Sequence, residues 1–264
     1  MTLAPQEIVN LIGLGVENAF KTSTKFLGID IDRFNNTDIH PEYLTTVEVA
    51  KSLISAELHV SLETHMKELR IQSRKMAWAN GRMGTLTRSE IDNTLARYKF
   101  GEKDSQRIDI LVRVGEENRP PLLMIEAKLG DKKLPGIIQD IDRIIRLFDM
   151  YESLGLLTSH KVYGAVVFHS MEEDNTSGTI TAAAQNLLKD VNKYLASPSV
   201  IPARSWLHEK AGLLQASSVS EPVTGYVEDY DDGQLETIFA KKSFYFAPGL
   251  ILLGNDTDIP NVTF

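Results

Sequence analysis

A glutamate and a lysine lie two residues apart in an otherwise apolar stretch, residues 122–130 (LLMIEAKLG). Buried Glu and Lys side chains are unfavourable unless they are paired or bound to something. Because side chains alternate along a strand, Glu126 and Lys128 would point to one face, and Ile125 and Ala127 to the other. The stretch therefore predicts a strand with one face that carries a carboxylate and an amine.

A second carboxylate lies on the strand that is expected just before this one. Residues 107–114 (RIDILVRV) alternate between two faces, and the GEENRPP that follows predicts a turn. In the resulting antiparallel hairpin, Asp109 lies about as far before the turn as Glu126 lies after it. Their side chains would be opposite or diagonal neighbours, with Cβ atoms roughly 5–8 Å apart.

The closeness of Asp109 and Glu126 predicts a metal ion, because two neighbouring carboxylates repel each other unless a cation lies between them. Mg2+ suits the pair, since it takes one or two carboxylates and keeps several waters; Mn2+ is expected to substitute for it. Lys128 would then orient or help to deprotonate a metal-bound water, or stabilise the charge that develops on a phosphate.

The segments around this hairpin alternate between helical and strand patterns. Apolar residues at helical spacing predict helices, and the nearly continuous apolar run KVYGAVVFHS predicts a strand buried on both faces. The segment KKSFYFAPGLILLGN predicts a hairpin or an edge strand. The expected helices cover residues 5–20, 43–58, 137–152 and 180–195, and the buried strand covers 161–170. No clean break divides the chain, so we expect a single α/β domain over residues 1–264.

The pattern Asp109 … Glu126-Ala127-Lys128, on adjacent strands between two helices, resembles the PD-(D/E)xK (restriction-endonuclease-like) nuclease superfamily. The resemblance covers about residues 40–170 and follows the order helix, Asp strand, ExK strand, helix, strand. It implies a central mixed β-sheet flanked by helices, here with extra N-terminal elements and a C-terminal elaboration over about 171–264. The sequence departs from the family name at one position, because Ile108 stands where the family has Pro.

The resemblance implies a Mg2+-dependent phosphodiester hydrolase, with Asp109 and Glu126 as metal ligands and Lys128 as the catalytic lysine. Many members also carry a glutamate on the first helix that completes the metal shell. The best match here is Glu48, which would then be both catalytic and a metal ligand.

Two weaker candidates for that helical glutamate are Glu57 and Glu63. Some members place a glutamine on the helix after ExK, and Gln139 occupies that place. The ExK triplet alone is weakly specific, since one is expected by chance in a chain of this size. The place of this triplet inside a predicted strand, opposite an aspartate, strengthens its interpretation as a catalytic motif. The single DxK (residues 131–133), in contrast, falls in an expected loop.

Charge is unevenly distributed along a chain whose net charge is −8. Residues 70–107 hold nine Lys/Arg and four acids, a net of +5, while residues 216–264 hold two lysines and eight acids, a net of −6. This asymmetry suits a surface that faces a polyanion, with DNA favoured over RNA. Candidate backbone contacts are Arg74, Lys75 and Arg82 in the basic stretch, and Arg143 and Arg146 on the helix 137–152.

The absence of cysteine excludes disulfides and cysteine-ligated metals, and it fits a reducing cytoplasm. No apolar run is long enough for a membrane span, so no membrane partner is expected. Symmetric cleavage of a duplex would require a homodimer. A zinc site from His59, Glu63 and His65 is disfavoured, because they lack HExxH spacing and their segment is typical of a solvated helix.

Two alternative functions are compatible with the same sequence. The first is a catalytically inactive nucleic-acid-binding or regulatory protein on the same fold. The second is a protein-interaction module whose sheet face is merely charged, in which Glu126 and Lys128 form an exposed pair of small energetic value. Binding of a divalent ion would separate the interaction module from the other two possibilities.

Overall fold

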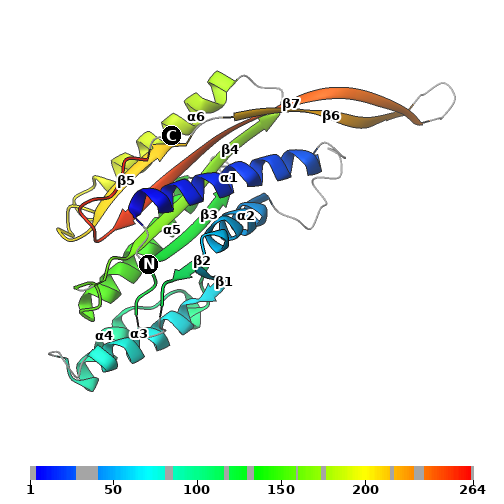
Figure 1. Ribbon diagram of the computed structural model, residues 1–264. Coiled ribbons are helices and arrows are strands. Elements are labelled where there is room, and N and C mark those ends of the chain that lie inside the picture. The colour runs from blue at the N-terminus through cyan, green and yellow to red at the C-terminus, as the bar shows by residue number, and fades with distance from the viewer. Residues whose placement is uncertain are drawn as a thin grey trace.

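The chain forms one mixed β-sheet with helices on both faces, as a computed structural model shows for residues 4–27, 41–80, 86–115, 119–129, 134–158, 160–173, 177–214, 217–228 and 235–262 (Figure 1). The strand order is β1-β2-β3-β4-β7-β5, and β6 pairs with β7. β3 and β4 are parallel, and the other neighbours are antiparallel. The strands are β1 (His59–His65), β2 (Arg107–Arg113), β3 (Leu123–Leu129), β4 (Tyr163–Glu173), β5 (His208–Leu213), β6 (Ser217–Glu228) and β7 (Leu235–Gly254).

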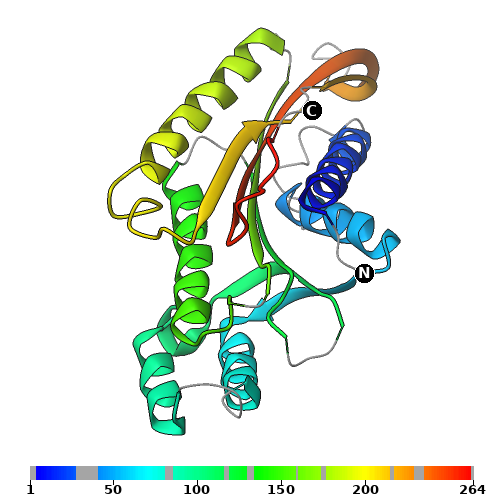
Figure 2. The same cartoon turned by 60° about the vertical axis from the view of Figure 1, so that its left-hand side comes forward.

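The helices bury the two faces of the sheet in two large apolar clusters. One face is covered by α1 (Pro5–Leu27) and α2 (Pro41–Ser55). The other face is covered by α3, α4, α5 and α6, and Figure 2 shows the sheet between the two groups. These four helices span Met66–Asn80, Arg88–Arg97, Leu134–Ser153 and Ser177–Leu195, and a short 3-10 turn (Glu102–Asp104) precedes β2. A small third apolar cluster joins α6 to β7.

A glycine on β4 brings α5 close to the sheet. A Cβ atom added to Gly164 would lie 2.3 Å from the Cγ2 atom of Ile144 and 3.1 Å from the ring of Phe148. Ile144 and Phe148 belong to the buried stripe of α5, so the missing side chain lets this helix rest directly on the β-strands. The polar residues earlier on α5 are thereby held over the neighbouring strand, β3.

Most elements predicted from the sequence are confirmed, and two predictions need correction. The helix expected around Glu63 is wrong, because residues 59–65 form the edge strand β1. Residues 241–255 contribute to a hairpin with β6, as predicted, but β7 is not an edge strand, since it lies between β4 and β5. Among the residues described, no helix is long and apolar enough to cross a membrane.

Candidate functional site

The antiparallel hairpin of β2 and β3 is confirmed. Ile110 lies opposite Ile125, and the same register continued by one residue brings Asp109 level with Glu126. The ladder of paired residues ends at Ile110. Beyond it, the Oδ2 atom of Asp109 accepts a hydrogen bond of 2.8 Å from the backbone N–H of Ala127. A side-chain carboxylate therefore takes the place of a backbone acceptor where the two strands separate.

The strand β1 adds a further acid on the other side of Asp109. The β1–β2 register places Glu63 level with Asp109, and Glu63 has a left-handed backbone conformation with φ of 51°. Burial raises the pKa of Asp109; the Ala127 N–H and Lys128 oppose the shift, while Glu63 and Glu42 add to it. Glu63 itself is exposed and forms an ion pair of 3.5 Å with Arg107.

Glu126 is buried and paired with an arginine of α5. Its side chain is 1% exposed, and its Oε1 atom lies 2.5 Å from Nη1 of Arg143. Burial raises the pKa of Glu126 well above its usual value, the nearby Asp109 raises it further, and Arg143 only partly offsets both. The ionised carboxylate is thus under-compensated, which is the condition that an additional cation relieves.

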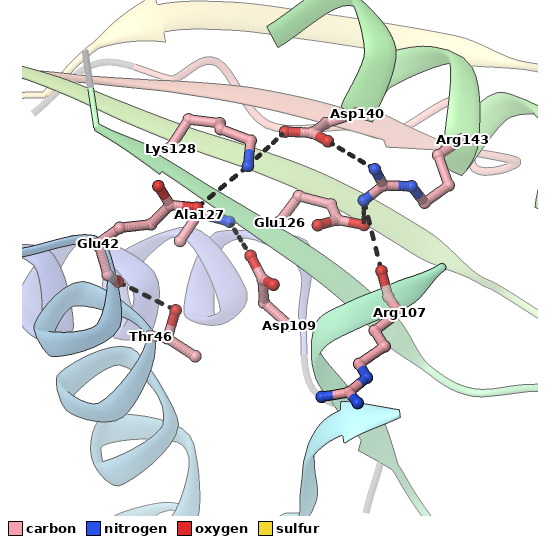
Figure 3. Close-up of polar contacts among 9 residues, drawn as sticks. All are labelled: Glu42, Thr46, Arg107, Asp109, Glu126, Ala127, Lys128, Asp140 and Arg143. Atoms are coloured by element: carbon pink, nitrogen blue, oxygen red, sulfur yellow. Dashed lines mark hydrogen bonds and ion pairs between the residues drawn. The ribbon is translucent and has the colours of Figure 1, made fainter. Parts of the chain in front are cut away.

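Lys128 lies between two carboxylates from two different helices (Figure 3). Its Nζ atom is 3.0 Å from Oε1 of Glu42 on α2 and 3.6 Å from Oδ2 of Asp140 on α5. Burial would lower the pKa of Lys128, but Asp140 and Glu42 together outweigh it and raise the pKa. The amine is therefore held as an ammonium at neutral pH, able to stabilise negative charge rather than to accept a proton.

Asp140 connects Lys128 to Arg143, which lies one turn further along α5. Its Oδ1 atom is 3.2 Å from Nη2 of Arg143, and its side chain is 1% exposed. Burial raises the pKa of Asp140 to about 6, with Lys128 and Arg143 opposing the shift. The buried Oδ2 atom of Asp140 has no hydrogen-bond partner among the described residues, since the ammonium of Lys128 is too far away to donate.

Six of the charged side chains in this region, from α2, β2, β3 and α5, form what we term the charged cluster. Four carboxylates and two cationic groups give it a net charge of −2 when all are ionised. That imbalance equals the charge of one divalent ion. The cluster consists of Glu42, Asp109, Glu126, Lys128, Asp140 and Arg143.

The donor groups of the charged cluster fit a hard divalent ion held mainly by water. Within the described part of the chain, no three His, Asp or Glu side chains converge as a ready-made metal centre. Asp109 and Glu126, level on adjacent strands, offer two carboxylates instead. Mg2+ is commonly bound by one or two carboxylates with several retained waters, so this smaller set is sufficient.

The structure brings together three of the predicted catalytic residues and leaves two apart. Asp109, Glu126 and Lys128 meet in the charged cluster. Glu48 lies elsewhere on α2, where its carboxylate pairs with Lys51 at 2.7 Å. Gln139 is exposed on α5.

Glu42 and Asp140 were not among the residues predicted from the sequence. The helix was predicted to begin at residue 43, so Glu42 fell just outside it, whereas α2 begins at Pro41. Asp140 did carry a signal, because it lies between Ile137 and Ile144 on the apolar stripe of α5. An acid on the buried face of a helix indicates a polar partner inside the protein.

The predicted nucleic-acid contacts are spread over three environments. Arg74 is exposed on α3, stacks over Trp78 at 6.0 Å and pairs with Asp92 of α4 at 2.9 Å. Lys75, next to it, is exposed. Arg143 is part of the charged cluster, with only 17% of its side chain exposed.

The remaining two candidates differ from Arg143 in their surroundings. Arg146 is exposed and donates to the backbone carbonyl of Lys99 at 2.8 Å. Arg82 lies outside the described residues, as does most of the predicted loop around it and the DxK triplet at 131–133.

Comparisons of the chain with protein-family models, with curated proteins and with solved structures found no match.

Proposed function

We propose that the protein is a Mg2+-dependent nuclease that hydrolyses phosphodiester bonds, with DNA as its substrate and a restriction-endonuclease-like core. One observation carries the proposal: Asp109 and Glu126 are level on adjacent strands, and Lys128 follows two residues after Glu126 in a cluster short of two positive charges. The order α2, β2, β3, α5, β4 supports it, because it follows the order of elements in the PD-(D/E)xK resemblance, with β1, α3 and α4 inserted between α2 and β2.

Under this proposal, five of the six residues of the charged cluster have distinct tasks. Asp109 and Glu126 would hold Mg2+, which when bound supplies a Lewis acid and lowers the pKa of its water. The Lys128 ammonium would stabilise charge that develops on the scissile phosphate. Glu42 and Asp140 orient that ammonium from opposite sides. The resemblance expects a functional glutamate on the helix that precedes the catalytic strands, which is α2 here. We therefore assign this role to Glu42 in place of Glu48.

The proposal is tested by incubating the purified chain with plasmid, linear DNA and RNA in Mg2+, Mn2+ or EDTA. We expect cleavage of DNA that EDTA abolishes and that is lost in Asp109→Asn. The Asp109→Asn variant should melt, without metal, no lower than the wild type, because a neutral amide relieves a buried charge and can still accept from Ala127. Glu17→Gln, at an exposed pair with Lys21 on α1, is the matched control.

A second candidate function is an inactive nucleic-acid-binding protein on the same architecture. The contact of 2.5 Å between Arg143 and Glu126 favours it, because an internal cation already faces one of the two carboxylates. Calorimetric titration with Mg2+ or Mn2+ distinguishes the two functions. Nucleic-acid binding with neither metal binding nor cleavage would support the inactive protein and overturn the nuclease.

A further inference from the structure

The guanidinium of Arg143 bridges two buried carboxylates in the charged cluster (Figure 3). Nη1 lies 2.5 Å from Glu126 and Nη2 lies 3.2 Å from Asp140, and each carboxylate is 1% exposed. Nη1 also lies 3.3 Å from the backbone carbonyl of Arg107. Arg143 is thus the main internal source of positive charge for Glu126, one of the two acids proposed above to hold the metal.

We propose that Arg143 acts as a resident counter-cation that competes with the divalent ion for Glu126. In the metal-free protein the guanidinium partly compensates Glu126. Metal binding requires that this contact be given up, so Arg143 sets the metal affinity of the site. The inference rests on the proposed function, because it presumes that Glu126 is a metal ligand.

Competition follows from the dimensions of the groups involved. Mg2+ lies about 2.1 Å from its carboxylate oxygens. With the guanidinium on Oε1 of Glu126, an ion on either oxygen of the same carboxylate would lie roughly 3–6 Å from the Arg143 charge, where like charges repel strongly in a buried site. Because this repulsion opposes holding both cations on one buried carboxylate, binding of the metal ion displaces the guanidinium from Glu126.

Arg143 has other acceptors that allow it to leave Glu126 without becoming unpaired. Asp140 and the carbonyl of Arg107 are already within hydrogen-bonding distance, so release of Glu126 removes one acceptor of three. A side chain 17% exposed also has a route toward solvent, where a planar guanidinium can pair with a phosphate. The exchange therefore needs a shift of one side chain and no movement of a strand.

The first test compares Mn2+ binding by the wild type, Arg143→Gln and Arg146→Gln, measured by calorimetry on the full chain without nucleic acid. Arg146 lies three residues further along α5 and is exposed, so the same substitution removes the same charge outside the cluster. We expect Arg143→Gln to bind Mn2+ about tenfold more tightly than the wild type, and Arg146→Gln to stay within about twofold of it.

Metal-free Arg143→Gln should also melt at a lower temperature than the wild type and recover more of its stability when Mn2+ is added. Equal or weaker Mn2+ binding by Arg143→Gln would overturn the competition while leaving the proposed function intact. A wild type and variant that both fail to bind any divalent ion would overturn both proposals.

The second test observes the displacement directly and does not depend on the stability of a glutamine variant. The Nε–H signal of Arg143, assigned by its loss in Arg143→Lys, is followed by NMR during titration of the wild type with diamagnetic Mg2+. We expect this signal to shift and exchange faster with water as the ion binds, while that of Arg204, which pairs with Asp149, stays unchanged. Metal binding with no change at Arg143 would overturn the inference.

Discussion

Under the proposed function, Lys128 is the residue that would distinguish a nuclease from a protein that only binds nucleic acid. Its ammonium is held by Glu42 and Asp140, and it lies two residues from the proposed ligand Glu126. A positive charge fixed in advance by two carboxylates, of which Asp140 is buried, needs little reorganisation when negative charge develops nearby. Under the proposed function, this residue would therefore stabilise the transition state.

We predict that Lys128→Ala retains metal binding but loses cleavage. Removal of a positive charge beside the carboxylates should keep or improve Mg2+ affinity, while turnover should fall by roughly two or more orders of magnitude. Calorimetry and a gel assay on one preparation measure both quantities. If the alanine variant cleaves at the wild-type rate, Lys128 has no role in catalysis.

Asp140 gives the metal-free protein a pH-dependent stability. Its pKa in the folded protein, about 6, lies above the ordinary value of 3.8, so folding favours the protonated form. This contribution to stability is complete below the ordinary pKa and is lost as the pH rises through about 6.

We therefore predict that Asp140→Asn flattens the decline of stability between about pH 4 and pH 7, the range that covers the ordinary pKa of the carboxyl and its pKa of about 6 in the folded protein. A shift of this size corresponds to about 1–3 kcal/mol. The measurement is the free energy of unfolding by urea in EDTA at several pH values, for the variant and the wild type. Parallel curves for the two proteins would show that Asp140 titrates alike in the folded and unfolded states.

The residues of the site were predictable to different degrees. Asp109, Glu126 and Lys128 follow from strand alternation and a short turn, both of which are local. Glu42 depends on where α2 begins, and the partners of Asp140 depend on how α5 rests against β3 at the position set by Gly164. Contacts of this kind, between elements that are distant in the sequence, cannot be predicted from the spacing of residues.

At the scale of single elements, α2 offers two acids with different surroundings. Glu42 contacts Lys128, whereas Glu48 pairs with Lys51 of its own helix. We predict that Glu42→Gln lowers the cleavage rate about tenfold, because the ammonium loses one of its two fixing partners. Glu48→Gln, an identical substitution on the same helix, should leave the rate within about twofold.

Single-turnover cleavage rates of the two variants decide this assignment. The reverse order of effects would restore Glu48, the residue that the family resemblance favours. Loss of activity in both variants, with unchanged melting temperatures, would mean that both acids of α2 contribute.

The helices α3 and α4 form the surface on which DNA binding is expected. Arg74 and Arg88 both lie over Trp78, at 6.0 and 5.1 Å, and Arg74 is also paired with Asp92. Lys75 is exposed beside them. The ring of Trp78 holds both arginines and Asp92 also holds Arg74, so under the proposed function they would present fixed positive charges to a phosphate backbone.

We predict that the double variant Arg74→Glu and Lys75→Glu binds DNA at least about tenfold more weakly than the wild type, because two positive charges are reversed. Binding by the wild type should fall steeply as salt rises, and the variant should show a shallower salt dependence. Fluorescence anisotropy at several salt concentrations measures both, with Lys189→Glu on α6 as the control. Salt-independent binding would remove this surface from the interface.

For the whole molecule, the sequence was sufficient for the α/β class but not for the strand order. Helical and strand periodicities located most elements because each depends on neighbouring residues. The edge strand β1 escaped prediction, since most of its residues are exposed and the segment lacks an apolar face. The position of β7 could not be predicted, because β4 and β7 are far apart in the chain.

β7 lies in the interior of the sheet, between β4 and β5, and this position has a consequence for synthesis of the protein. β4 is paired along its length with β7, from Tyr163 opposite Gly254 to Glu173 opposite Phe244, and among the described strands β5 is joined to the sheet only through β7. A nascent chain therefore exposes an open, apolar strand edge at β4 until residues 235–254 have left the ribosome. The sheet is completed only after translation of this interior strand, and in that interval an exposed edge of β4 favours aggregation.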